Sequence, residues 1–299
     1  MAKVRPYPYH VLDVFTTTRF AGNPLAVVLN ADDMSDEAMQ KIAREFNLSE
    51  TIFVMAPAMN EHEARVRIFT PQYEMPFAGH PTVGCAVFLA ERHWPKGSVD
   101  EVLVLEEEAG LVPVRVVRDN KTMRATFTAP VIPFPVGDEL DRNAVAATLG
   151  LDVSELGDHP AQTHEGGPSF TYVHLRDVAA LEKARVTEPH WSAVHVDAQR
   201  DSTFLYAPDG EGRYRTRMFA PGSGIGEDPA TGSASAILAS QLLQVDALDD
   251  GTTELQLIQG VEMGRRSEID LAIDVTNGAI GAVRVSGSAV RVADGQVLA

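Results

Sequence analysis

The chain contains a single cysteine, Cys85, among its 299 residues. One thiol excludes an internal disulfide framework and a cysteine-rich zinc site. The nine histidines form no H-E-x-x-H pattern and no close cluster, so the sequence gives a metal site no support. We therefore expect a protein without a bound metal, whose two halves are each long enough to bury a core of their own.

Basic residues are scarce, because 25 Lys and Arg stand against 42 Asp and Glu, for a formal net charge of −17. A broadly acidic surface repels nucleic acids and anionic membranes. The N-terminus has no apolar core of signal-peptide length, and no segment approaches the roughly 18 uninterrupted apolar residues of a membrane span. We expect a cytoplasmic protein with no nucleic-acid or membrane partner, which binds a small anion through local positive charge.

Nucleotide-binding motifs are also missing. The glycines Gly222, Gly224 and Gly226 do not have the spacing of the G-x-G-x-x-G fingerprint, and Asp228 in front of a helix would repel a pyrophosphate. The sequence has no Walker lysine and no G-x-S-x-G elbow. We therefore expect no cofactor.

An internal repeat is present. GHPTVGCA at 79–86 resembles EDPATGSA at 227–234, which aligns His80 with Asp228 at an offset of 148. Three more pairs recur in the same order at offsets of 150 or 151: TIFVMAP and STFLYAP, RIFTP and RMFAP, and EAG and IQG. The repeat predicts two homologous halves, which we place at residues 1–128 and 129–299, with a return of the last strands to the first half as an alternative.

Within each half, β-branched and aromatic runs separated by turn residues predict mostly strands. Residues 35–46 have the serine cap, the early acids and the apolar spacing of an amphipathic helix. The stretches that open at Pro81 and Pro229 are small or apolar nearly all round, which is typical of enclosed helices. The fold class we predict is α/β (α+β): two pseudo-symmetric domains, each a barrel-like β-sheet around a central helix that begins at His80 or Asp228.

The two predicted helix starts are candidate anion sites, because helix N-termini offer unpaired amides. If the halves face one another, both starts serve one cleft. Histidine is a poor capping residue, so His80 has roughly equal claims to function and to structure. Asp228 suits the cap of a helix that begins at Pro229, and capping is the simpler interpretation there. Ser233 is also explained as a small helix residue.

Glu50 lies between the predicted helix 35–46 and the strand TIFVMA. Most glutamates in such junctions are only solvated. The apolar neighbours Leu48, Ile52 and Phe53 would, if they bury it partly, raise its pKa toward that of a useful general acid and base. Glu50 is therefore a candidate catalytic residue, although the solvated alternative is the commoner one.

Arginines stand at matched positions of the two halves, Arg65 and Arg67 in the first and Arg215 and Arg217 in the second, and Glu74 lies near the first pair. All four arginines fall within predicted strands. We interpret these five residues as solvated or paired strand residues rather than as ligands of an anionic substrate.

Four motifs together carry a family resemblance: FAGNP at 20–24, NLSET at 47–51, FAGHPT at 77–82 and EDPATGSA at 227–234. In this order they resemble the phenazine-biosynthesis PhzF-like isomerase family, over about residues 9 to 295. The resemblance implies the diaminopimelate-epimerase-like fold, with the active site between two similar domains, and a homodimer. It assigns proton transfer to Glu50 and places His80, Asp228 and Ser233 around the substrate.

Related cofactor-free epimerases and racemases use two cysteines where this chain has His80 and Asp228, so a two-thiol racemization is excluded. The resemblance implies a cofactor-independent isomerase that moves a proton on a small carboxylated ring metabolite, similar to dihydro-3-hydroxyanthranilate. Amides near Gly79, Gly232 and Ser233 would hold the carboxylate. The alternatives are an epimerase or another proton-transfer enzyme on the same scaffold, and a non-catalytic small-molecule-binding protein.

Overall fold

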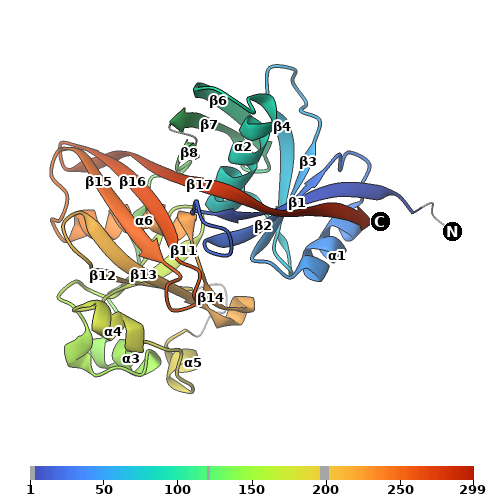
Figure 1. The fold of residues 1–299 in the computed structure, drawn as a ribbon. Helices are drawn as coiled ribbons and strands as arrows, with labels where there is room; N and C mark the ends of the chain where they lie inside the picture. The colour runs from blue at the N-terminus through green and yellow to red at the C-terminus, as the bar shows by residue number, and fades with distance from the viewer. Residues whose placement is uncertain (1–3, 120–121, 196–201) are drawn as a thin grey trace. The chain divides into compact units, whose positions relative to one another are not determined.

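The computed structural model describes residues 4–119, 122–195 and 202–299 (Figure 1). The chain forms two compact units. Unit 1 comprises residues 1–128 and 286–299, and unit 2 comprises residues 129–285. The long last strand β17 (Ala279–Leu298) therefore runs from unit 2 into unit 1, where it pairs antiparallel with β1 (Pro6–Val14).

Unit 1 is a closed strand barrel. Its pairings run through β1, β2, β3, β4, β6, β7, β8 and β17 and return to β1. The β2–β3 and β4–β6 pairs are parallel, and the β1–β2, β3–β4, β6–β7 and β7–β8 pairs are antiparallel. Besides β1 and β17, the strands of this unit are β2 (Asn23–Leu29), β3 (Glu50–Met55), β4 (Ala64–Phe69), β5 (Glu74–Met75), β6 (Val99–Glu107), β7 (Gly110–Asp119) and β8 (Thr122–Thr128).

The helix α2 (Gly79–His93) is enclosed by this barrel, and residues 79–90 are all buried. At Gly84 a Cβ atom would lie 2.6 Å from a Leu25 methyl carbon and 2.7 Å from one of Val14. Only glycine allows the helix to approach the strands so closely. The outer helix α1 (Asp36–Phe46) begins after Ser35, whose side chain accepts a hydrogen bond from the Ala38 amide, so the prediction for residues 35–46 is confirmed.

Unit 2 repeats the plan. Parallel pairs join β11 to β12 and β13 to β15, and antiparallel pairs join β10 to β11, β12 to β13 and β15 to β16. The helix α6 (Gly232–Gln244) is buried over most of its length. The strands are β9 (Phe134–Val136), β10 (Gln162–Glu165), β11 (Ser169–His174), β12 (Thr203–Pro208), β13 (Arg213–Ala220), β14 (Ile225–Asp228), β15 (Gly251–Gln259) and β16 (Ser267–Thr276).

Unit 2 also contains three short helices that the sequence analysis did not predict: α3 (Arg142–Thr148), α4 (Val178–Lys183) and α5 (His190–Val194). Trp191 of α5 shares one core cluster with apolar residues of α3, of α4 and of the adjacent strands. Helices of five to seven residues are too short for a periodic apolar pattern. The available signal was the N-cap: Asp141 and Asp177 accept from the backbone amides of Ala144 and Ala180.

The predicted start of the second enclosed helix was wrong. Helix α6 begins at Gly232, with Thr231 as its N-cap residue, and Asp228 is instead the last residue of β14. The physical reason is that side chains from distant strands already bond the carbonyl groups that a first helical turn at Pro229 would use. The Gln259 amide donates to the Asp228 carbonyl at 2.8 Å, and the Ser267 hydroxyl donates to the Pro229 carbonyl at 2.7 Å.

Candidate active site

In unit 1 the structure brings Glu50 and His80 together. Glu50 is the first residue of β3, not a loop residue, and its partner across the parallel β2–β3 pair is Leu25. His80 is the second residue of α2, and its Nδ1 lies 2.8 Å from Glu50 Oε2. The side chain of His80 is 3% exposed and that of Glu50 is 15% exposed. The partial burial expected for Glu50 is therefore present, and it comes with an imidazole partner.

The contact of the second ring nitrogen of His80 determines which atoms of the Glu50–His80 pair can carry a proton. Nε2 is 3.2 Å from the carbonyl oxygen of Asn23, the first residue of β2. A carbonyl oxygen only accepts hydrogen bonds, so Nε2 carries a hydrogen. The contact with Glu50 then holds one proton, which belongs to Nδ1 when the carboxylate is ionised and to Oε2 when the pair is neutral. This contact with Asn23, in the FAGNP motif, was not anticipated.

The remaining carboxylate oxygen of Glu50 is open. Among residues 4–119, 122–195 and 202–299, Oε1 has neither a hydrogen-bond partner nor a place among the buried unpaired oxygens. The N-cap residue Ala78 provides no side-chain bond to the first turn of α2. In the same described ranges, the backbone amides of Gly79 and His80 have no protein acceptor. The start of α2 thus combines a carboxylate oxygen without a protein partner with free amide donors.

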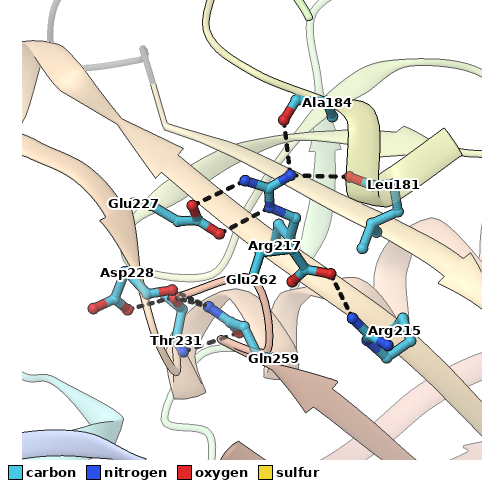
Figure 2. Close-up of polar contacts among 9 residues, drawn as sticks. All are labelled: Leu181, Ala184, Arg215, Arg217, Glu227, Asp228, Thr231, Gln259 and Glu262. Atoms are coloured by element: carbon cyan, nitrogen blue, oxygen red, sulfur yellow. Dashed lines mark hydrogen bonds and ion pairs between the residues drawn. The ribbon is translucent and has the colours of Figure 1, made fainter. Parts of the chain in front are cut away.

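In unit 2 the corresponding start is built around an amide side chain (Figure 2). Asp228 is buried, and one of its carboxylate oxygens accepts from the Thr231 hydroxyl at 2.5 Å. Gln259 accepts from the Thr231 backbone amide at 3.2 Å and donates to the Thr231 hydroxyl oxygen at 3.0 Å. Neither Thr231 nor Gln259 was singled out from the sequence. Gln259 is part of the repeat pair EAG and IQG, but nothing in that short match indicated a role at the site.

The predicted binding residues Gly232 and Ser233 are the first two residues of α6. Thr231 gives this helix no side-chain cap. Within the part of the chain that the structure describes, the backbone amides of Gly232 and Ser233 have no protein acceptor, and the half-buried Ser233 hydroxyl has no partner. These groups can donate to an anion.

The arginines at matched positions are mostly paired, as expected. Arg67 binds Glu74 through two bonds of 2.6 and 2.5 Å, and Arg217 binds Glu227 through two bonds of 2.8 and 2.9 Å. Arg215 forms an ion pair with Glu262, whereas Arg65 is exposed on β4. The charges of Arg67, Arg215 and Arg217 are therefore already paired with protein carboxylates.

Three further observations concern metals, the single cysteine and membranes. Among the residues that the structure describes, no three or more His, Cys, Asp or Glu side chains are grouped so that they could hold a metal ion. Cys85 is fully buried in α2, and burial raises the pKa of its thiol. No helix of the described chain combines the length and the apolar character that a membrane span requires.

Comparison with known proteins identifies the family. A family model described as phenazine biosynthesis-like protein matches residues 12–295. The chain belongs to this PhzF family. It is 42% identical over 300 residues to an uncharacterized isomerase of Mesorhizobium japonicum, covering 97% of this chain and 98% of that protein. It is 37% identical over 298 residues to the trans-2,3-dihydro-3-hydroxyanthranilate isomerase of Pseudomonas aeruginosa, covering 96% and 98%.

A solved structure of the PhzF family from Bacillus anthracis has a TM-score of 0.86 at 26% identity and covers 99% of this chain and 100% of its own. The predicted fold class, strand barrels around central helices in the manner of diaminopimelate epimerase, is confirmed. The enzyme class is confirmed as well, because relatives across the PhzF family are named isomerases. The chain is an isomerase of the PhzF family.

Proposed function

We propose that this isomerase moves a proton between two carbon atoms of a small carboxylated ring metabolite, with Glu50 as the general acid and base. The substrate class follows the trans-2,3-dihydro-3-hydroxyanthranilate isomerase to which the chain is similar. In the reaction Glu50 removes a proton from one carbon, the electron pair delocalises over the ring, and the same carboxyl group returns the proton to a second carbon. Atoms and charge balance without a cofactor.

The observation that carries the proposal is the geometry of Glu50. One oxygen is fixed by His80 at 2.8 Å, while the other has no hydrogen-bond partner among the described residues. A carboxylate held in this way has one direction left in which to accept a proton. Acid–base catalysis by a positioned side chain contributes on the order of 10²–10⁴-fold, and positioning of the substrate supplies much of the rest.

His80 supports the base through charge. When Glu50 is ionised, the shared proton lies on Nδ1 and the ring is an imidazolium, because Nε2 already carries a hydrogen toward Asn23. A positive ring beside the site stabilises the negative charge that develops when a carbon acid loses its proton.

The remaining site assignments stay predictions within this proposal. Asp228 is assigned a hydrogen bond to the amine or hydroxyl of the substrate. The same expectation for His80 is not kept, because its two ring nitrogens contact Glu50 and Asn23 and its side chain is 3% exposed. The free amides of Gly79, Gly232 and Ser233 are assigned to its carboxylate, where an acidic protein can offer local positive potential. The homodimer implied by the family resemblance is proposed on that ground alone.

The test is proton NMR of the protein with trans-2,3-dihydro-3-hydroxyanthranilate in deuterium oxide. We expect the wild-type protein to convert the compound and Glu50→Gln to lose at least about 10³-fold in turnover, because the amide cannot take up a proton. Glu45→Gln is the matched control, because Glu45 is an exposed residue of α1 and should retain full turnover.

The outcomes separate the hypotheses. Unchanged turnover in Glu50→Gln contradicts the role of Glu50. No conversion by a folded wild-type protein contradicts the proposed substrate. A product of inverted stereochemistry with deuterium at the inverted carbon identifies an epimerase on the same scaffold.

A further inference from the structure

Arg217 joins three separate segments of unit 2 (Figure 2). Its Nε and Nη2 atoms donate to the two carboxylate oxygens of Glu227 in β14. Its Nη1 donates to the carbonyl oxygens of Leu181 and Ala184, at 3.0 and 2.7 Å, where α4 ends. A positive charge at a helix C-terminus is also favourable. Arg217 therefore connects its own strand β13 with the short helix α4 and with β14.

These contacts leave Arg217 little capacity for a substrate. Three of its nitrogen atoms are engaged by four protein acceptors, and the side chain is 9% exposed. The guanidinium group has five N–H donors in a fixed planar arrangement. Nearly all of them are used inside the protein, so the role of this arginine is structural or positioning rather than ligand binding.

Glu227 immediately precedes Asp228 in β14. Successive side chains of a strand point to opposite faces, so a carboxylate held through both oxygens fixes the rotation of the strand at Glu227 and thereby the direction of Asp228. The strand β14 is only four residues long and its pairing with β13 is irregular, so its placement depends on side-chain contacts: the Glu227 pair, and the bonds of Asp228 with Thr231 and Gln259. A Cβ at Gly226 would meet no atom within 4 Å.

We infer that Arg217 and Glu227 form a positioning pair that holds the Asp228 carboxylate in its binding direction and couples it to helix α4. The catalytic consequence rests on the proposed function, in which Asp228 binds the substrate. The pair is distinct from the Arg67–Glu74 pair of unit 1, where the second partner of the arginine is the exposed Asp36. Arg67 also reaches a helix in this way, since Asp36 is the first residue of α1, but it contacts an exposed side chain there, whereas Arg217 contacts carbonyl groups at the end of α4.

The first measurement is amide hydrogen exchange by mass spectrometry on the full-length protein. We expect Glu227→Gln to accelerate exchange in residues 225–231 by about tenfold or more relative to residues 234–242 of α6, because local opening no longer breaks a charged bidentate contact. Asp274→Asn is the matched control. It removes another bidentate arginine pair of unit 2, with Arg284, and should leave the ratio between the two peptides unchanged.

The second measurement is a double-mutant cycle on kcat/KM for trans-2,3-dihydro-3-hydroxyanthranilate. If the pair acts through Asp228, Glu227→Gln lowers kcat/KM by about tenfold in the wild-type background and has almost no effect beside Asp228→Asn, because coupled residues are not additive. Asp274→Asn should have the same small effect in both backgrounds. A general loss of stability would instead lower activity equally with and without Asp228.

Equal, additive effects of Glu227→Gln in both backgrounds overturn the inference, as does uniform acceleration of exchange over unit 2. Different outcomes would contradict the proposed function. If Asp228→Asn alone keeps wild-type kcat/KM, or if the compound is not converted at all, then the role of Asp228 or the substrate is wrong. In that case the exchange ratio between residues 225–231 and 234–242 still decides whether the pair holds β14.

Discussion

At the starts of the two enclosed helices, α2 and α6, a threonine is hydrogen-bonded by side chains of different chemistry. In each unit the last residue of a long strand contacts a threonine near the helix start: Glu107 of β6 contacts Thr82, and Gln259 of β15 contacts Thr231. Gln259 is an amide and can donate and accept at any pH. Glu107 is a carboxylic acid, so its ability to donate depends on its protonation.

The hydrogen bonds in unit 1 indicate that Glu107 is protonated. The Thr82 hydroxyl lies 2.7 Å from the Ala78 carbonyl and 2.7 Å from Glu107 Oε1. A hydroxyl has one hydrogen. If it donates to the carbonyl, which can only accept, then Glu107 must donate to the hydroxyl. Burial raises the pKa of Glu107 to about 8, which agrees with a neutral acid at pH 7. The protonated acid of Glu107 and the amide of Gln259 thus both donate a hydrogen bond to a threonine hydroxyl.

The largest expected difference between the two helix starts is catalytic. His80→Gln should lower kcat by about 10²–10⁴-fold, because Glu50 loses the imidazole partner that holds its carboxylate in place. Asp228→Asn should mainly raise KM, since Asp228 is assigned to binding. Steady-state kinetics on trans-2,3-dihydro-3-hydroxyanthranilate measure both. Equal losses of kcat in the two variants would mean that both helix starts transfer protons, as in a two-base epimerase.

The second difference concerns stability. The Arg217–Glu227 side chains are 9% and 17% exposed, against 21% and 29% for Arg67–Glu74. Arg217→Gln leaves a largely buried carboxylate and two α4 carbonyl groups without their donor, so it should lower the free energy of unfolding of unit 2 by about 3–5 kcal/mol. Arg67→Gln should cost unit 1 about 1 kcal/mol.

Denaturant unfolding can separate the units, because the two tryptophans report on different units. Trp94 follows α2 in unit 1 and Trp191 lies in α5 of unit 2. Trp191→Phe and Trp94→Phe backgrounds therefore give one fluorescence signal per unit. Similar losses for Arg217→Gln and Arg67→Gln would remove the distinction between the two arginine pairs.

Much of this comparison was accessible from the sequence. The repeat aligned His80 with Asp228, and the all-apolar stretches predicted two enclosed helices, because a helix without a polar face must be covered on every side. The contact between Glu50 and His80 was not accessible. These residues are 30 positions apart, and their contact depends on the register of β2 with β3 and on the depth of α2 in the barrel.

The error at Asp228 has a related cause. Local preference favoured a helix from Pro229, since proline suits a first turn and aspartate suits a cap. The groups that prevent it, Gln259 and Ser267, come from distant strands. Local signals cannot reveal a carbonyl that is taken by a residue about 30 positions away. Tertiary contacts override local preference at such places.

The two units should respond to pH with opposite signs. In unit 1, the Glu107 pKa rises from 4.5 to about 8 on folding because of burial. Between these values the native state binds more protons, so stability falls as pH rises, by about 1.4 kcal/mol per pH unit. In unit 2, burial lowers the pKa of His164 and of His174 from 6.5 to about 4. There the unfolded state binds more protons, and stability rises with pH across that range.

Denaturant unfolding at pH 4.5, 6.5 and 8, followed through Trp94 or Trp191, measures these slopes. From pH 6.5 to 8 unit 1 should lose about 2 kcal/mol, whereas unit 2 gains its stability below pH 6.5. Glu107→Gln is the control, since a permanent amide should remove the loss in unit 1 and imitate Gln259. A loss that persists in Glu107→Gln would assign it to another group and contradict the protonated acid.

The smallest expected effect is at Ser233, which the repeat aligns with Cys85. Cys85 is fully buried, but the Ser233 side chain is half-buried and its hydroxyl has no partner in the described chain. Ser233→Ala therefore removes no protein hydrogen bond, and the stability of unit 2 should not change. If the hydroxyl binds the substrate, KM should rise by about 2- to 10-fold, the equivalent of one hydrogen bond of about 0.5–1.5 kcal/mol. An unchanged KM would make Ser233 only the small helix residue that its sequence context also allows.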